Sequence, residues 1–178
     1  MNKSYVILVD RKDNEKGIME KMEAHSKAIL HRAISVFICN SNGEWLLQRR
    51  AISKYHSGGL WTNASCTHPS YEETNTEAAN RRLLEEMGMK SNLIELFSFI
   101  YLEKLDNELT EHELDHVFLG ITDEKPNINT DEVMEWKYIS YNDLKKEIKS
   151  NPSNFTVWFK KIVGKVNNQI KDLQTERV

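Results

Sequence analysis

Cysteine, proline and long apolar runs are all scarce in this sequence, and each shortage excludes a class of protein. The 178 residues include two cysteines and three prolines, too few for a disulfide-stapled scaffold or a proline-rich linker. No stretch approaches the roughly 20 apolar residues of a transmembrane helix, and the start of the chain has no apolar segment of signal-peptide length. We therefore expect a cytoplasmic protein that does not enter a membrane and folds as one domain over residues 1–178.

Positive charge is not in excess either. The formal net charge is −3, with 24 Lys and Arg against 27 Asp and Glu. Because clustered Lys and Arg dominate nucleic-acid binding, we expect no nucleic-acid partner. A small anionic substrate fits the composition, since a local basic cluster is enough to bind one. The sequence leaves open whether the chain is a monomer or a homodimer.

The two cysteines lie in different surroundings. Cys39 belongs to the apolar run AISVFIC and is interpreted as a small buried residue. Cys66 is flanked by polar residues, with His68 two positions later. Cys66 is therefore the cysteine to consider for chemistry.

Apolar and β-branched runs predict more strands than helices. The predicted strands are Tyr5–Val9, Ala33–Cys39, Glu44–Gln48, Leu93–Leu105, Leu109–Ile121 and Val133–Ile139. Turns are expected at Asn40–Gly43, which carries an Asn-Gly signal, and at Asp106–Asn107. Since no long alternation of strand and helix occurs, the pattern favours an α/β fold built as an α-β-α sandwich with a mixed sheet.

A helix after Thr74 is the best-marked element. Thr74 and Glu77 form a capping box, and Gly88 suits the position just past the helix end. The apolar stripe of this helix is only partial and consists of Ala78, Leu83, Leu84 and Met87. Two further helices are expected, over residues 140–148 and 155–173.

The same helix carries two adjacent glutamates, Glu85 and Glu86. An isolated pair of this kind is most often part of a solvated helix face. Here the spacing around the pair resembles the Nudix box, and the matching residues are Thr67, Glu73, Arg81, Leu83, Glu85, Glu86, Gly88 and Met89. Adjacent carboxylates on such a helix can hold Mg²⁺ against a diphosphate. The sequence departs from the box twice, with Thr67 in place of a glycine and Arg82 in place of a glutamate, and the second change argues against hydrolysis.

A nine-residue segment before this helix is more specific. The segment WTNASCTHP (residues 61–69), together with HRAISVF (residues 31–37), resembles the type 1 isopentenyl-diphosphate isomerases, a branch of the Nudix fold. The resemblance covers most of the chain. It implies an active-site cysteine at Cys66 and a metal-binding histidine at His68.

The resemblance also implies a carboxylate pair, Glu111 and Glu113, on a later strand. Residues two apart in a strand share a face, so both carboxylates point the same way while His112 points opposite. The implied metal shell consists of His25, His31, His68, Glu111 and Glu113. Such a mixed shell of nitrogen and oxygen donors suits Mg²⁺, Mn²⁺ or Zn²⁺. His25 and His31 converge only if a helix end bends into a strand between them.

The remaining polar residues of this region are given ordinary roles. A lone histidine is more often a surface or core residue than a ligand. On that basis the sequence interprets three histidines, His56, His112 and His116, as structural. Asp115 is interpreted as strand surface.

The reaction that the resemblance implies moves a double bond by one carbon, from isopentenyl to dimethylallyl diphosphate, in isoprenoid biosynthesis. Protonation of the alkene gives a tertiary carbocation, so the site needs a proton donor, a proton acceptor on the far side and a dry pocket. Cys66 and Glu113 are the implied pair, since a thiol with a pKa of roughly 8.5 is mostly protonated at neutral pH. Tyr101 is the implied route of proton exchange with Glu113.

The implied substrate needs positive charge at one end and electron-rich groups at the other. By resemblance, the contacts to the diphosphate are Lys21, Arg50, Lys54 and Arg82. Glu86 would help to hold a second Mg²⁺ that arrives with the diphosphate. Trp158 lies over the carbocation, which an indole face stabilises by about 2 kcal/mol, and Trp61 walls the same pocket. Core packing in the last helix is the alternative for Trp158.

Two other functions stay open from the sequence. A Nudix pyrophosphohydrolase would use Glu85 and Glu86 to activate water, but Arg82 argues against it and the segment 61–69 would have no purpose. A binding or sensor protein of the same fold would keep ligand affinity without turnover. An intact acid, base and metal shell argues against that function.

Overall fold

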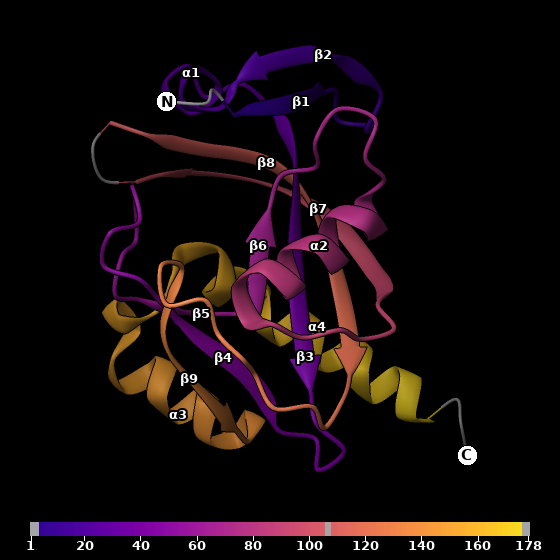
Figure 1. Cartoon of the computed structure of the whole chain (residues 1–178), viewed down its shortest axis with the longest axis vertical. Helices are drawn as coiled ribbons and strands as arrows, with labels where there is room; N and C mark the ends of the chain where they lie inside the picture. Colours follow the sequence, from indigo (N-terminus) through magenta and orange to yellow (C-terminus); the bar gives the residue numbers. More distant parts are fainter. Residues whose placement is uncertain (1–3, 106–107, 176–178) are drawn as a thin grey trace.

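The computed structural model describes residues 4–105 and 108–175 (Figure 1). Strands dominate the first two thirds of the chain, and the longest helix closes it. The strands are β1 (Tyr5–Val9), β2 (Glu15–Glu20), β3 (His31–Cys39), β4 (Trp45–Arg50), β5 (Trp61–Thr62), β6 (Ser65–Thr67), β7 (Ile94–Lys104), β8 (Thr110–Ile121) and β9 (Val133–Ile139). The helices are α1 (Lys21–Ser26), α2 (Asn75–Met87), α3 (Tyr141–Ser150) and α4 (Val157–Thr175), with a 3₁₀ turn at Pro152–Asn154.

The described strands form one mixed sheet around β3. Strand β3 pairs in parallel with β8 over its whole length, and pairs antiparallel with β1, β4 and β6. Strand β7 extends the sheet beyond β8, and β9 extends it beyond β4, both antiparallel. Every residue of β3 is buried, as expected for a strand that is covered on both faces. The predicted mixed sheet is confirmed.

Alternate residues of β3 enter two separate cores. Phe37 and Cys39 belong to the core that also contains Phe159 of α4 and Leu144 of α3. Ile34, Val36 and Ile38 belong to the core that contains Leu83 of α2. Helix α2 therefore covers one face of the sheet while α3 and α4 cover the other, and Figure 1 shows α2 and α4 on opposite sides of β3. This arrangement is the predicted α-β-α sandwich.

Helix α2 begins and ends as its sequence predicts. Thr74 and Glu77 form the reciprocal capping box, and Gly88 adopts a left-handed conformation with φ of 64°. A side chain at Gly88 would also be excluded by space, because its Cβ would lie 2.3 Å from the Asn127 carbonyl oxygen. The predicted apolar stripe was wrong at Leu84, which is 47% exposed. Ala79, which the predicted stripe left out, lies in the core on the side of the helix that faces the sheet.

Most predicted strands lie within two residues of their observed bounds. The structure adds the strands β2, β5 and β6 and the helix α1, which are two to six residues long and have no clear apolar periodicity. The predicted turn at Asp106–Asn107 lies outside the described residues. In residues 4–105 and 108–175, no helix is both long and apolar enough to span a bilayer.

Candidate active site

Three neighbouring strands bring polar side chains into one row on the face of the sheet that α4 covers. His31 of β3 is paired with Glu113 of β8, and Glu113 is paired with Tyr101 of β7. Residues paired across strands point to the same face. The row therefore follows directly from strand register, and none of these three residues needs a special backbone conformation.

His25 and His31 are held with one ring nitrogen free. The short helix α1 ends at Ser26 and the chain turns into β3, so the expected bend between the two histidines is present. Each Nδ1 lies 2.8 Å from a backbone carbonyl oxygen, Lys21 for His25 and Ile29 for His31. A carbonyl only accepts, so each Nδ1 carries the proton and each Nε2 presents a lone pair. Both Nε2 atoms are buried and have no hydrogen-bond partner among the described residues.

These two lone pairs face His68 and Glu113. One ligand atom from each of His25, His31, His68 and Glu113 lies within 4.8 Å of all the others. His68 Nε2 is 3.0 Å from Glu113 Oε1, and the Nε2 atoms of His31 and His25 are 3.6 and 4.0 Å from the same oxygen. A buried, unpartnered imidazole nitrogen is costly unless something binds it. The donor set therefore fits a divalent metal ion, and we call these four residues the His₃Glu group.

Electrostatics favour the ligand forms of these residues. Burial lowers the pKa of His68 to about 3 and also lowers the pKa of His25, so both rings are neutral at pH 7. Burial alone would raise the pKa of Glu113, but the adjoining His31 and His68 hold it well below its usual value. Neutral His25 and His68 beside an ionised Glu113 are the protonation states that metal binding requires.

Glu111 lies beside the His₃Glu group but is not a member of it. Tyr101 Oη is 2.6 Å from Glu113 Oε2 and 3.1 Å from Glu111 Oε2, so one hydroxyl links the two carboxylates. This contact confirms that Glu111 and Glu113 share a face, while His112 Nδ1 turns to the Ala28 carbonyl. Burial and the nearby charge of Glu113 raise the pKa of Glu111 well above its usual value. The predicted shell of five is thus a group of four with Glu111 adjacent.

Cys66 faces the same cavity from β6. Pairing of β6 with β3 sets Cys66 opposite Ser35, whose Oγ is 3.8 Å from Cys66 Sγ. Asn63 is fully buried, and its Nδ2 lies 3.2 Å from Cys66 Sγ. Burial, with the charge of Asp115 as the next cause, raises the pKa of Cys66 to about 12. The group is therefore a thiol at neutral pH and able to give a proton.

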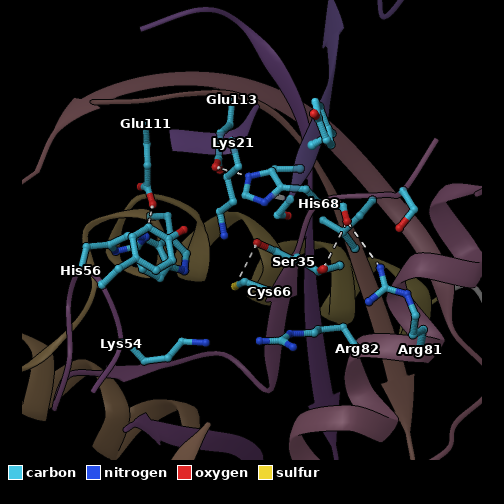
Figure 2. Close-up of a pocket in the computed structure, with 18 of the residues that line it drawn as sticks. Lys21, Ser35, Lys54, His56, Cys66, His68, Arg81, Arg82, Glu111 and Glu113 are labelled. Carbon is cyan, nitrogen blue, oxygen red and sulfur yellow. Dashed lines mark hydrogen bonds and ion pairs between the residues drawn. The ribbon is translucent and has the colours of Figure 1, made fainter. Parts of the chain in front are cut away.

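A cavity of about 530 Å³ is lined by Cys66, His68, Tyr101, Glu111 and Glu113 together with five cationic side chains, Lys21, Arg50, Lys54, Arg81 and Arg82. Figure 2 shows the ends of Lys21, Lys54 and Arg82 directed into the space that Cys66 faces. Burial and the charge of Lys54 lower the pKa of Lys21 to about 8. Arg50 is held in place by its bond from Nη2 to the His56 carbonyl, at 3.2 Å. All four predicted diphosphate contacts line the cavity.

The two adjacent glutamates of α2 differ in burial. Glu85 is exposed, whereas Glu86 is buried and accepts a 2.6 Å bond from Gln48 Nε2. Arg82 Nη2 lies 2.6 Å from Glu86 Oε1 and 2.8 Å from Glu132 Oε2. Lys54 also pairs with Glu132. Glu132 therefore positions two of the cations, and no sequence motif had indicated it.

Only one of the two predicted aromatic walls is present. Trp158 lines the cavity and is 3% exposed. Trp61 is the correction: it does not line the cavity, and Lys137 Nζ lies 4.7 Å from its ring centroid. Trp61 opens the short strand β5, which pairs with β4, and its ring turns toward Lys137 of β9, the strand that pairs with the other edge of β4.

Two polar residues that the sequence interpreted as structural lie in or beside the site. His56 lines the cavity, with Nε2 3.6 Å from Glu111 Oε1. Asp115 is not strand surface but 1% exposed, and its Oδ2 accepts a 2.7 Å bond from Ser35. The parity that Asp115 shares with Glu113 was the signal for this placement. His116 lies outside the cavity, between Glu95 and Asp13.

Comparisons with known proteins find a matching family and similar sequences. The family described as "NUDIX domain" matches residues 29–159. The chain is 46% identical to an isopentenyl-diphosphate Delta-isomerase of Pectobacterium atrosepticum, over 97% of this chain and 96% of that protein. It is 47% identical to isopentenyl-diphosphate Delta-isomerase 2 of Photorhabdus laumondii, over 92% and 93%.

Solved structures share the fold at low sequence identity. A crystallised MutT protein of Methanosarcina mazei superimposes with a TM-score of 0.65 at 18% identity, covering 80% of this chain and 96% of that one. A Deinococcus radiodurans protein gives a TM-score of 0.68 at 20% identity, over 83% and 90%. At such identities these structures speak for the fold alone.

Proposed function

We propose, from the premise that this chain belongs to the Nudix family and to its isopentenyl-diphosphate Delta-isomerases, that it converts isopentenyl diphosphate into dimethylallyl diphosphate. The observation that carries this proposal is one cavity lined by a protonated thiol, by His68 and Glu113 of the His₃Glu group and by the four cationic side chains predicted to bind the diphosphate. Each part meets one requirement of the reaction: an acid, a base held near a metal, and a clamp for a diphosphate.

The His₃Glu group is the proposed site of a divalent ion, Mn²⁺, Mg²⁺ or Zn²⁺. His25, His31 and His68 would supply neutral nitrogens and Glu113 a carboxylate oxygen, with Glu111 beside them. A bound divalent cation supplies positive charge that keeps the carboxylates ionised and polarises what contacts it. A second Mg²⁺, arriving with the substrate diphosphate, would be held with the help of Glu86.

Cys66 and Glu113 are the proposed acid–base pair. One donates a proton to the terminal alkene carbon, which leaves a tertiary carbocation, and the other removes a proton from the adjacent methylene so that the double bond forms one carbon away. Tyr101 donates its hydroxyl proton toward Glu113 at 2.6 Å and is the proposed route by which that carboxylate exchanges protons. Asn63 Nδ2–H, at 3.2 Å from the sulfur, supports Cys66 when it is deprotonated.

The remaining residues bind and protect the substrate. Lys21, Arg50, Lys54 and Arg82 hold the diphosphate, with Arg82 suited to phosphate oxygens by its planar fork. The indole of Trp158 faces the hydrocarbon end, where an electron-rich ring stabilises the carbocation by about 2 kcal/mol. Burial of the alkene keeps water from capturing the cation.

A single incubation tests the proposal. The protein is mixed with Mg²⁺, Mn²⁺ and isopentenyl diphosphate in heavy water, and dimethylallyl diphosphate and free phosphate are both measured. We expect deuterated dimethylallyl diphosphate without phosphate release. Phosphate from nucleotide diphosphates would indicate a hydrolase, and tight binding without either product would indicate a sensor.

Matched cysteine variants assign the acid. Cys66→Ala should abolish isomerisation while the protein keeps its metal content. Cys39→Ala is the control, because Cys39 is buried in the core between the sheet and α4 and does not line the cavity. Full activity in Cys66→Ala would refute the acid–base assignment.

A further inference from the structure

The loop between β4 and β5 is built to deliver one side chain, His56, into the cavity. Ser57 adopts a left-handed backbone conformation with φ of 52°, which is strained for a residue other than glycine. Gly58 is required by space, since a Cβ there would lie 2.6 Å from the Ile52 carbonyl oxygen. Arg50 Nη2 donates a hydrogen bond to the His56 carbonyl oxygen. A strained backbone persists only where the surrounding structure holds it. Here the tight packing at Gly58 and the bond from Arg50 hold the loop, and the loop sets the position of His56.

Two aromatic rings immobilise the imidazole. The Tyr55 ring lies edge-on to it with centroids 4.3 Å apart, and the Trp158 ring lies edge-on with centroids 5.7 Å apart. His56 as a whole is 7% exposed. These two edge-to-face contacts hold the orientation of the imidazole ring, so each ring nitrogen points in a fixed direction.

Each nitrogen of His56 has one polar neighbour. Nδ1 lies 3.2 Å from Ser57 Oγ, and Nε2 lies 3.6 Å from Glu111 Oε1. A serine hydroxyl donates to Nδ1 when the ring proton is on Nε2, which then faces the carboxylate. The contact of 3.6 Å is longer than a hydrogen bond but within the range of an ion pair. The other Glu111 oxygen lies 3.1 Å from the Tyr101 hydroxyl oxygen.

We propose that His56 is a positioning residue for Glu111: its Nε2–H holds one carboxylate oxygen so that Glu111 faces the His₃Glu group and adds to metal binding there. This inference deepens the proposed function and rests on it for the identity of the reaction. Its central claim, however, concerns metal affinity and can be tested without any substrate. Partners that orient a metal ligand typically contribute 10- to 100-fold in metal affinity or activity.

Two substitutions separate the N–H of His56 from its ring. His56→Phe keeps an aromatic ring between Tyr55 and Trp158 but has no donor for Glu111, whereas His56→Gln keeps an amide donor and loses the ring. Mn²⁺ affinity of the EDTA-treated proteins is measured by calorimetry, and kcat and KM for isopentenyl diphosphate by product formation. We expect His56→Phe to weaken Mn²⁺ binding and lower kcat by about 10-fold or more, with KM within about 2-fold, and His56→Gln to recover most of both.

His116 provides the matched control. It is also 7% exposed and contacts two carboxylates, but it lies outside the cavity. His116→Phe should lower thermal stability and leave Mn²⁺ affinity and kcat unchanged. If the phenylalanine ring at position 56 prevents folding, His56→Leu carries the same expectation.

Two results would overturn the proposal: wild-type Mn²⁺ affinity in His56→Phe, or a His56→Gln variant impaired as much as His56→Phe or more, which would show that a donor at position 56 does not restore metal binding. Failure of the proposed function looks different. In that case the unsubstituted protein forms no dimethylallyl diphosphate, while its Mn²⁺ affinity still responds to substitution of His56.

Discussion

Arg82 has two functions in this structure, and its structural one can be measured without any substrate. Its guanidinium Nη2 lies 2.6 Å from Glu86 Oε1, and the Glu86 side chain is only 3% exposed. Removing one partner of a buried ion pair destabilises a protein by roughly 3–5 kcal/mol, because the other charge is left uncompensated. Lys54 Nζ remains 3.8 Å from Glu86, and Gln48 still donates to it. We therefore expect the lower end, about 3 kcal/mol, for Arg82→Ala.

This loss should appear directly in thermal unfolding. For a chain of this length 1 kcal/mol corresponds to about 2–4 °C in Tm, so Arg82→Ala should unfold about 6–12 °C below the unsubstituted protein in calorimetry. Arg81→Ala is the control on the same helix. Arg81 is more exposed than Arg82, 34% against 18%, and its partners Glu73 and Glu85 are 14% and 42% exposed, against 3% for Glu86. Its removal therefore leaves less buried charge uncompensated, and we expect a smaller decrease of about 2–4 °C.

A second substitution tests the cause. If the uncompensated charge of Glu86 destabilises Arg82→Ala, then adding Glu86→Gln should restore most of the lost Tm. Burial raises the pKa of Glu86, and removing Arg82 raises it further, so the folded variant binds a proton more readily than the unfolded chain does. Stability of Arg82→Ala should therefore recover as pH falls from 7 toward 5. An Arg82→Ala variant no less stable than Arg81→Ala, or one that Glu86→Gln does not rescue, would refute the reasoning.

Three further predictions concern the metal, the diphosphate clamp and the aromatic wall. Mn²⁺ at about 1,000 times its Kd should stabilise the EDTA-treated protein by about 4 kcal/mol, or about 8–16 °C in Tm, and His25→Gln should lose most of this shift; an equal shift in both would argue against His25 as a ligand. Substrate affinity should fall as pH rises through about 8, where Lys21 loses its charge, but not in Lys21→Arg, because guanidinium stays protonated; the comparison is of KM against pH. Trp158→Leu should lower kcat about 30-fold, the equivalent of about 2 kcal/mol, whereas Trp136→Leu, outside the cavity, should not.

The sequence predicted those parts of the structure that depend on local patterns. Strand parity placed Glu111 and Glu113 on one face, and the capping box and Gly88 marked both ends of α2. Turn chemistry located the hairpin at Asn40–Gly43, where Gly43 N–H donates to the Asn40 carbonyl. Each of these features is set by residues close in sequence, so no knowledge of the tertiary fold was needed.

Features set by long-range packing were not predictable in this way. His56 has no motif around it, and its role depends on Glu111 and Trp158, which lie 55 and 102 positions later in the sequence. Glu132 sits in a loop before β9 and reaches Lys54 and Arg82 only through the fold. The direction of the Trp61 ring was also undetermined, because a residue at the start of a two-residue strand has no periodicity to orient it.

The substitution at position 82 explains how a scaffold shared with hydrolases can leave a diphosphate uncut. The glutamate that the Nudix box has at this position would stand one helical turn before Glu86, and two such carboxylates would attract metal ions to that helix. Arg82 instead neutralises Glu86 at 2.6 Å and faces the cavity as a phosphate donor. The same change therefore removes a metal-binding carboxylate and adds a cation for substrate. In the proposed reaction, chemistry then takes place at the other end of the substrate, at the thiol of Cys66 and the carboxylate of Glu113.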